Sequence, residues 1–133
     1  MTRYAIDAAT LLELATAGRA VHPAHQLVAP AGIRSHALDL LLAQVAAGEL
    51  DERTALVRHD RITETRVRLL NDRVSRRVAW EIARQLGFAS VRDAEYLAIA
   101  KLQADALVTA DPALSAAAAG LVPVAQPEAL FRA

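Results

Sequence analysis

The sequence contains no cysteine, few aromatic residues and no long apolar run. Without cysteine there can be neither a disulfide framework nor a thiolate metal site. No apolar run reaches the ~18 residues needed to span a bilayer. Two acids, Asp7 and Glu13, interrupt the apolar stretch at the N-terminus, which disfavours a signal peptide. We therefore expect a cytoplasmic protein that does not enter a membrane.

Aromatic residues make up 4% of the chain, whereas all apolar residues together make up 54%. This composition favours a helix-rich protein whose core is packed by Leu, Val, Ile and Ala. A chain of 133 residues is long enough to bury one hydrophobic core. We expect a single domain over residues 1–133.

The formal net charge is zero, but the charges are unevenly distributed along the chain. Residues 53–92 hold ten Arg and four acids, whereas residues 1–52 hold three Arg and six acids. Residues 93–133 hold five acids, one Lys and one Arg. Positive surface near clustered carboxylates suits a phosphate-rich substrate. The alternative is that the Arg residues simply lie on solvated helix faces.

Short apolar runs alternate with segments of helical periodicity. Strands separated by helices indicate βαβ units and an α/β fold with a mostly parallel sheet. The expected strands span residues 3–7, 27–30, 65–70, 105–109 and 121–126. The expected helices span residues 8–18, 31–50, 51–63, 71–87, 90–104 and 111–120.

Two of the expected strands are followed at their carboxyl ends by an acid, Asp7 and Asp111. Asp93 lies near the start of the helix that leads into the second of these strands, so all three carboxylates can meet at one edge of a parallel sheet. Like charges that converge need a proton or a cation, and oxygen ligands favour Mg²⁺ or Mn²⁺. Alternatively, the three acids are separate helix caps, and Pro112 after Asp111 fits such a cap.

Two blocks carry a resemblance to a known family: "YAIDAATLLEL" (4–14) and "RDAEYLAIAKLQADALVTADPAL" (92–114). In this order, with a helix-rich middle between them, they resemble a PIN domain of the VapC-like toxin ribonucleases. The resemblance implies a three-layer α/β fold with about four to five short parallel strands. It also implies a metal-dependent ribonuclease whose catalytic, Mg²⁺- or Mn²⁺-binding acids fall on Asp7, Asp93 and Asp111. An antitoxin protein and a second copy of the chain are the partners it implies.

The sequence departs from the family pattern in "PAGIRSHALDLL" (30–41), where His36 stands in the place of a Glu. A neutral imidazole is a poor ligand for Mg²⁺ and an acceptable one for Mn²⁺. His36 could shift the metal preference, or Asp39 on the same helix face could replace the missing acid. The alternative is a weakened nuclease that serves as an RNA- or antitoxin-binding module. A phospho-acceptor receiver domain ranks lower, because Asp7 lacks the acidic neighbour that such domains use.

The expected helix over residues 71–87 places Arg73, Arg77 and Arg84 on one face, where they could guide RNA phosphates or pair with acids of a partner. We expect three of the five large aromatic residues, Trp80, Phe88 and Tyr96, to pack in the core or between helices rather than to stack on bases. The leucines after Asp7 belong either to the core or to a dimer face; they are Leu11, Leu12 and Leu14.

Overall fold

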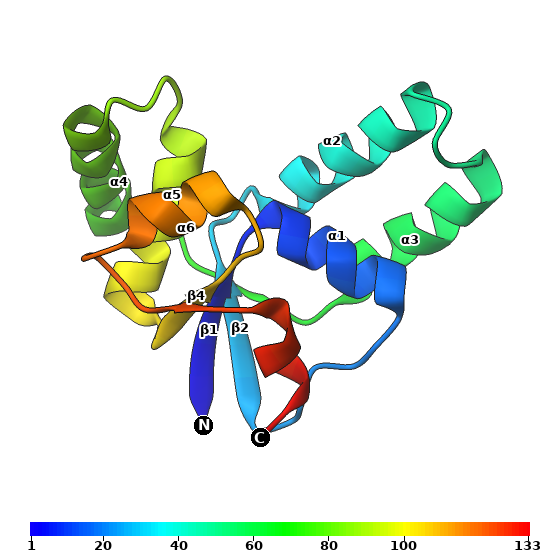
Figure 1. Ribbon diagram of the computed structural model, residues 1–133, viewed down its shortest axis with the longest axis horizontal. Helices are drawn as coiled ribbons and strands as arrows, with labels where there is room; N and C mark the ends of the chain where they lie inside the picture. The colour runs from blue at the N-terminus through cyan, green and yellow to red at the C-terminus, as the bar shows by residue number, and fades with distance from the viewer.

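The computed structural model describes residues 1–133 as an α/β fold with a five-stranded, all-parallel sheet and six α-helices (Figure 1). The strands are β1 (Thr2–Ile6), β2 (His25–Ala29), β3 (Arg68–Leu69), β4 (Ala106–Val108) and β5 (Val124–Ala125). The helices are α1 (Ala8–Ala17), α2 (Ile33–Ala46), α3 (Glu52–Glu64), α4 (Arg73–Leu86), α5 (Val91–Gln103) and α6 (Pro112–Ala118), followed by a short 3₁₀ helix, η1 (Pro127–Phe131). The predicted fold class is confirmed.

Helix boundaries follow the capping residues of the sequence. The Asp51 carboxylate accepts a hydrogen bond from the backbone N–H of Thr54 at the start of α3. Asp72 and Ser75 form a reciprocal capping box at the start of α4, which satisfies backbone donors that the helix itself leaves free. Helix α1 ends at Gly18, whose φ of 63° lies in the left-handed region that glycine adopts without strain.

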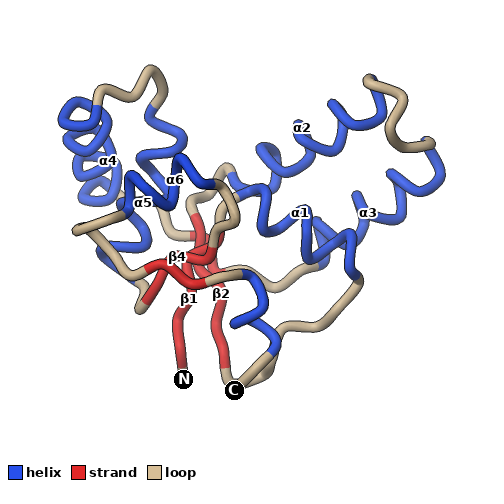
Figure 2. Tube along the Cα trace, viewed as in Figure 1, coloured by secondary structure: helices blue, strands red, loops and turns tan.

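The strand order β3-β2-β1-β4-β5 divides the helices into two layers. From β1 the chain moves outward to β2 and β3; it then returns past β1 to β4 and continues outward to β5 in the opposite direction. Because parallel crossovers are right-handed, this reversal places α1–α3 on one face and α4–α6 on the other. Figures 1 and 2 show these two groups of helices on either side of the sheet.

The core lies between the sheet and the two helix layers. Its fully buried side chains include Ile6 on β1, Leu107 on β4 and Leu97 on α5. The leucines of α1 are buried as well, so they belong to the core rather than to a dimer face; they are Leu11, Leu12 and Leu14. No helix is long and apolar enough to cross a bilayer.

Several sequence expectations differ from the structure. The strands predicted over residues 65–70 and 121–126 contain only two paired residues each. Both are edge strands, which need pairing on one side only, and alternation alone does not fix their length. The helix predicted over residues 31–50 ends at Ala46, because Gly48 adopts a φ of 75°. Tyr96 is buried as predicted, but Trp80 is 56% exposed, so its core placement was wrong.

Candidate functional site at the carboxyl ends of β1 and β4

Asp7 and Asp111 follow two strands that are direct neighbours in the sheet. Strands β1 and β4 pair in parallel, with Ile6 opposite Val108, so the segments that follow them leave the same edge side by side. The chain leaves β1 toward β2 and leaves β4 toward β5, which makes this edge the point where the direction of winding reverses. Open α/β sheets bind ligands at such reversal points. The topology therefore places both acids where a ligand site is expected.

A buried threonine, Thr109, connects the two acids. Its hydroxyl Oγ1 donates to Oδ2 of Asp7 at 2.7 Å and accepts from the backbone N–H of Asp111 at 3.0 Å. The other oxygen of Asp7, Oδ1, accepts from the backbone N–H of Thr10 at 2.9 Å, which caps α1. Asp111 caps α6 through the N–H of Ala113 at 2.9 Å. These contacts join Asp7, Thr109 and Asp111 into one network, which we call the Asp7–Asp111 network.

Asp7 is buried, with only 4% of its surface exposed, and it forms no ion pair with an Arg, Lys or His. Its hydrogen-bond partners are neutral groups, a hydroxyl and a backbone amide. A buried carboxylate is costly unless it is hydrogen-bonded and its charge is balanced. The hydrogen bonds are present, and the start of α1 supplies partial positive charge, but no side-chain cation balances the rest, so a cation would have a favourable place beside Asp7.

Asp93 lies in the first turn of α5, exposed to solvent, where the helix dipole favours an acid. It does not cap its own helix, because Ser90 accepts the capping hydrogen bond from the N–H of Arg92. The cap interpretation therefore describes Asp7 and Asp111 but not Asp93. No hydrogen bond or ion pair within the chain engages the carboxylate of Asp93, which leaves both of its oxygens available to a ligand.

His36 and Tyr96 join the two helix layers above the sheet edge. Nδ1 of His36, on α2, lies 2.7 Å from the hydroxyl oxygen of Tyr96, on α5. Because α2 and α5 cover opposite faces of the sheet, this hydrogen bond links the two helix layers. Tyr96 is buried and His36 is half-buried. Nε2 is therefore the ring nitrogen of His36 that remains for another contact.

Burial, together with nearby charges, sets the protonation of this pair. Burial lowers the pKa of His36 and the positive charge of Arg92 lowers it further, whereas Asp93, Asp39 and Asp7 act in the opposite direction without prevailing. His36 is therefore a neutral imidazole at pH 7. Burial also raises the pKa of the Tyr96 hydroxyl, and the charge of Asp7 adds to this effect. The hydroxyl keeps its proton throughout the physiological range.

A polar cavity of about 340 Å³ opens beside this pair. His36, Asp39, Asn71, Arg92 and Tyr96 line it, so α2, α5 and the loop before α4 all contribute. The three predicted acids Asp7, Asp93 and Asp111 do not line this cavity. It extends from the His36–Tyr96 contact toward the basic helix α4 and is large enough for part of a nucleotide.

The donor set suits a hard cation, but the side chains form no compact group of ligands. Carboxylate oxygens of Asp7, Asp93 and Asp111 are the donors that Mg²⁺ and Mn²⁺ prefer. No three or more His, Asp or Glu side chains lie close enough together to hold an ion. Asp7 and Asp111 are tied to their helix caps, and Asp93 and Asp39 extend into solvent. The chemistry of the donors fits Mg²⁺ or Mn²⁺, and the ion itself stays a prediction.

The predicted arginines Arg73, Arg77 and Arg84 all lie exposed on α4. Thr109 had no predicted role, although it lies two residues before Asp111 in the block over residues 92–114. A buried hydroxyl two residues before an Asp could have suggested a hydrogen bond to the Asp111 backbone. The bond to Asp7 could not have been foreseen, because it joins residues that are 102 positions apart.

The fold and this edge define an α/β protein with acids gathered at the reversal point of a parallel sheet. No family model matches the chain, and no curated protein matches it. Among solved structures, the chain is similar to the crystal structure of PAE2754 from Pyrobaculum aerophilum, with a TM-score of 0.71 and 23% sequence identity. That similarity covers 98% of this chain and 93% of the other. At this identity the likeness shows the fold alone.

Proposed function

We propose that the protein is a metal-dependent endoribonuclease, the toxin of a toxin–antitoxin pair, as its resemblance to PIN domains implies. The observation that carries the proposal is the Asp7–Asp111 network at the reversal point of the sheet. Asp7 is a buried carboxylate without a basic partner, and the Asp93 carboxylate forms no hydrogen bond or ion pair within the chain, so a divalent cation would balance charge at this edge. The basic segment over residues 53–92 supplies charge for an RNA substrate.

In this proposal Asp7, Asp93 and Asp111 hold Mg²⁺ or Mn²⁺, which when bound lowers the pKa of a water molecule and offsets charge on a phosphate oxygen. Thr109 and the N–H of Thr10 fix the orientation of the Asp7 carboxylate. Arg92, which lines the polar cavity, would contact a phosphate of the RNA.

The proposal is tested by the Asp93→Asn variant. Asp93 is exposed and forms no hydrogen bond or ion pair, so in urea the variant should lose no more than the helix-dipole contribution of about 0.3–1 kcal/mol, yet lose RNA cleavage in Mg²⁺ and Mn²⁺. Asp60→Asn on α3 is the matched control, an exposed acid far from the sheet edge, and should cleave normally. If Asp93→Asn cut RNA as fast as the parent in Mn²⁺, the assignment of the three acids would be wrong.

His36 supports a second candidate, a catalytically weakened module that binds RNA or an antitoxin. Its Nδ1 is engaged by Tyr96, and burial together with Arg92 keeps the ring neutral, so it does not supply the negative charge that a Glu would. The two candidates are separated by the His36→Glu variant. A gain of cleavage with Mg²⁺ would favour the weakened module, whereas unchanged or reduced cleavage would favour a native site that uses the histidine.

An apolar groove between α2 and α3 supports the proposed partners. Leu42 is 66% exposed and Leu56 is 54% exposed, and both line this groove together with Asp39. Asp39 also lines the polar cavity, so the groove borders the candidate site. We propose that an antitoxin segment binds here. A second copy of the chain is the other partner that the resemblance implies.

A further inference from the structure

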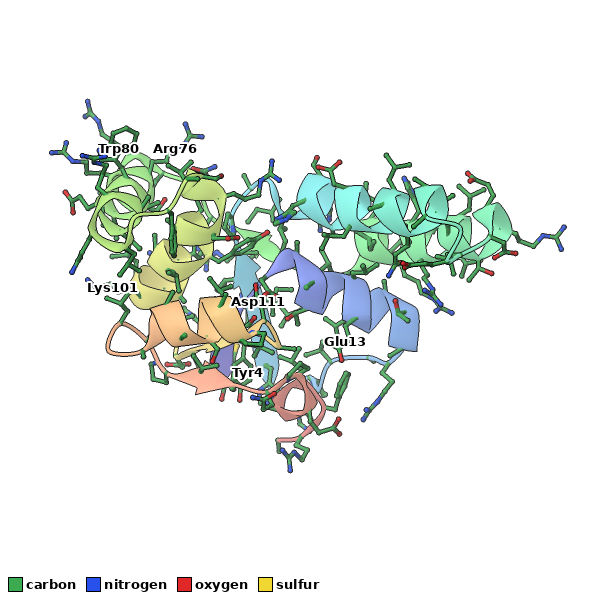
Figure 3. All side chains as sticks on the ribbon, turned by 45° about the horizontal axis from the view of Figure 1, so that its top comes forward. Tyr4, Glu13, Arg76, Trp80, Lys101 and Asp111 are labelled. Atoms are coloured by element: carbon green, nitrogen blue, oxygen red, sulfur yellow. The ribbon has the colours of Figure 1, made fainter.

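The outer face of α4 carries the one tryptophan of the chain in an exposed position. Trp80 is 56% exposed and lies outside the hydrophobic core and the residues packed against it. Figure 3 shows Trp80 and Arg76 together on the side of α4 that points away from the sheet. Exposing this much of an indole ring forgoes the stabilisation that burial would give. The fold does not use Trp80, which leaves its ring available for a ligand.

Four arginines surround Trp80 on the same face. Arg76 and Arg84 lie one helical turn before and after it, and Arg73 and Arg77 lie on the same side of α4. With a rise of 1.5 Å per residue, Arg76 and Arg84 are about 12 Å apart along the helix axis. The opposite face of α4 is apolar and packs on α5, so all four guanidinium groups lie on the solvent side.

Most of this positive charge is not balanced within the chain. Arg77 pairs with Glu81 at 3.2 Å, and the Nε of Arg76 donates to the side chain of Asn71. Arg73 and Arg84 form no ion pair or side-chain hydrogen bond. No guanidinium group stacks on the Trp80 ring; the one such contact in the chain joins Arg19 and Phe131. No cation therefore occupies the ring of Trp80, whose exposed part lies beside an excess of positive charge.

We propose that this face of α4 binds single-stranded RNA, with an unpaired base stacked on Trp80 and its flanking phosphates held by Arg76 and Arg84. Aromatic rings between cations are how proteins hold single strands without reading their sequence. A base inside a duplex has no free face, so the site selects unpaired nucleotides. The inference rests on the proposed ribonuclease function and adds to it the class of substrate.

The bound strand has a direct route to the candidate site. Arg76 contacts Asn71, and Asn71 lines the polar cavity with His36 and Arg92. A strand stacked on Trp80 can therefore pass along Arg76 and Asn71 to the edge of the sheet. A protein partner would be the other use of such a face, but four Arg beside one Glu match phosphates better than they match a typical protein surface.

Binding can be measured without cleavage. In EDTA, a fluorescently labelled 15-nucleotide oligouridine is titrated with the protein and its anisotropy recorded. The intrinsic fluorescence of Trp80, the single tryptophan, is followed at the same time with unlabelled RNA. We expect RNA to quench the fluorescence of the parent protein. We expect Trp80→Ala to bind the oligouridine roughly 5- to 100-fold more weakly than the parent. Trp80→Phe should keep most of the affinity, because the ring that stacks is retained.

Controls separate stacking from charge and from folding. Val57→Ala removes another exposed apolar side chain, on α3, and should leave RNA affinity unchanged. A plot of log affinity against log salt concentration has a negative slope. Arg84→Gln should make that slope shallower by about 0.7, because one phosphate contact to a single strand is lost. A duplex of the same length should bind more weakly than the single strand and quench Trp80 less.

Three results would overturn the inference: no RNA binding, an equal affinity of Trp80→Ala and the parent, or equal quenching by duplex and single strand. If Trp80→Ala instead abolished self-association by light scattering while RNA affinity held, the face would be a protein interface. RNA binding through Trp80 without any cleavage in Mn²⁺ would remove the proposed nuclease function and leave the single-strand site standing.

Discussion

Replacing Thr109 with valine should destabilise the protein although the two side chains have nearly the same shape. Valine keeps the volume of the buried site and suits the end of a strand, so neither a cavity nor a loss of strand propensity follows. What disappears is the hydroxyl group. Oδ2 of Asp7 then loses its donor, and the N–H of Asp111 loses its acceptor.

The lost hydrogen bond to Asp7 accounts for most of the expected decrease in the free energy of unfolding. A hydrogen bond to a charged group contributes about 1.5–3 kcal/mol, and a buried carboxylate cannot replace the hydroxyl with water. Asp7 is 4% exposed and Thr109 is 1% exposed, so both partners lie in the interior. Asp111 is exposed, and its N–H can turn to solvent at a cost of no more than about 1 kcal/mol. We expect the free energy of unfolding to fall by about 2–4 kcal/mol.

Urea denaturation of the parent, Thr109→Val and Thr109→Ser measures this difference. Serine keeps the hydroxyl and loses one methyl group, which costs about 1 kcal/mol. The variant that looks most conservative in shape should therefore be the less stable of the two. Asp7→Ala combined with Thr109→Val completes a double-mutant cycle in which each single change removes the hydrogen bond between residues 7 and 109, so the coupling energy measures that bond.

The order of the two variants decides whether the reasoning holds. If Thr109→Val were as stable as Thr109→Ser, the hydroxyl would not support the buried charge of Asp7. A coupling energy near zero in the double-mutant cycle would also show that the Thr109 hydroxyl does not stabilise Asp7. Either result would remove the Asp7–Asp111 network as the feature that organises the sheet edge.

Two further predictions concern other parts of the chain. Gly18→Ala should lower the free energy of unfolding by about 1–2 kcal/mol, because Gly18 has a φ of 63° and an added Cβ would lie 3.1 Å from Nη1 of Arg61. Gly32→Ala, at an ordinary φ with open space around it, should be neutral in the same thermal or urea measurement, and equal effects at the two positions would contradict the account. Arg92→Gln should raise the pKa of His36, because one of the two effects that lower it is removed while Asp93, Asp39 and Asp7 remain. An NMR titration of the imidazole measures this change, and an unchanged or lower pKa would refute it.

Local signals explain which parts of the fold the sequence predicted well. Asp51 and Asp72 precede α3 and α4 as caps, and Gly18 and Gly87 follow α1 and α4, so those boundaries could be placed within a residue or two. The positions of Asp7 and Asp111 at one sheet edge followed from the parallel topology alone. This inference needed no knowledge of the side chains.

Long-range contacts explain most of what the sequence did not predict. The two-residue strands β3 and β5 form because they pair with β2 and β4. Alternation in the sequence predicted strands that were too long. The residues His36 and Tyr96 are 60 positions apart, and no local sequence pattern predicts their contact. Trp80 was predicted to be packed because of its residue type. Its position on the same face of α4 as four arginines indicates solvent exposure instead.

The place of β1 in the middle of the sheet has a consequence for synthesis on the ribosome. The first strand to emerge pairs with β2 soon afterwards, but its other edge waits for β4, about a hundred residues later at 5–20 residues per second. Until then that edge of β1 is unpaired, and the hydrogen bond from Thr109 to Asp7 cannot form. The acidic edge is therefore assembled among the last parts of the molecule, and a nascent chain carries no finished site.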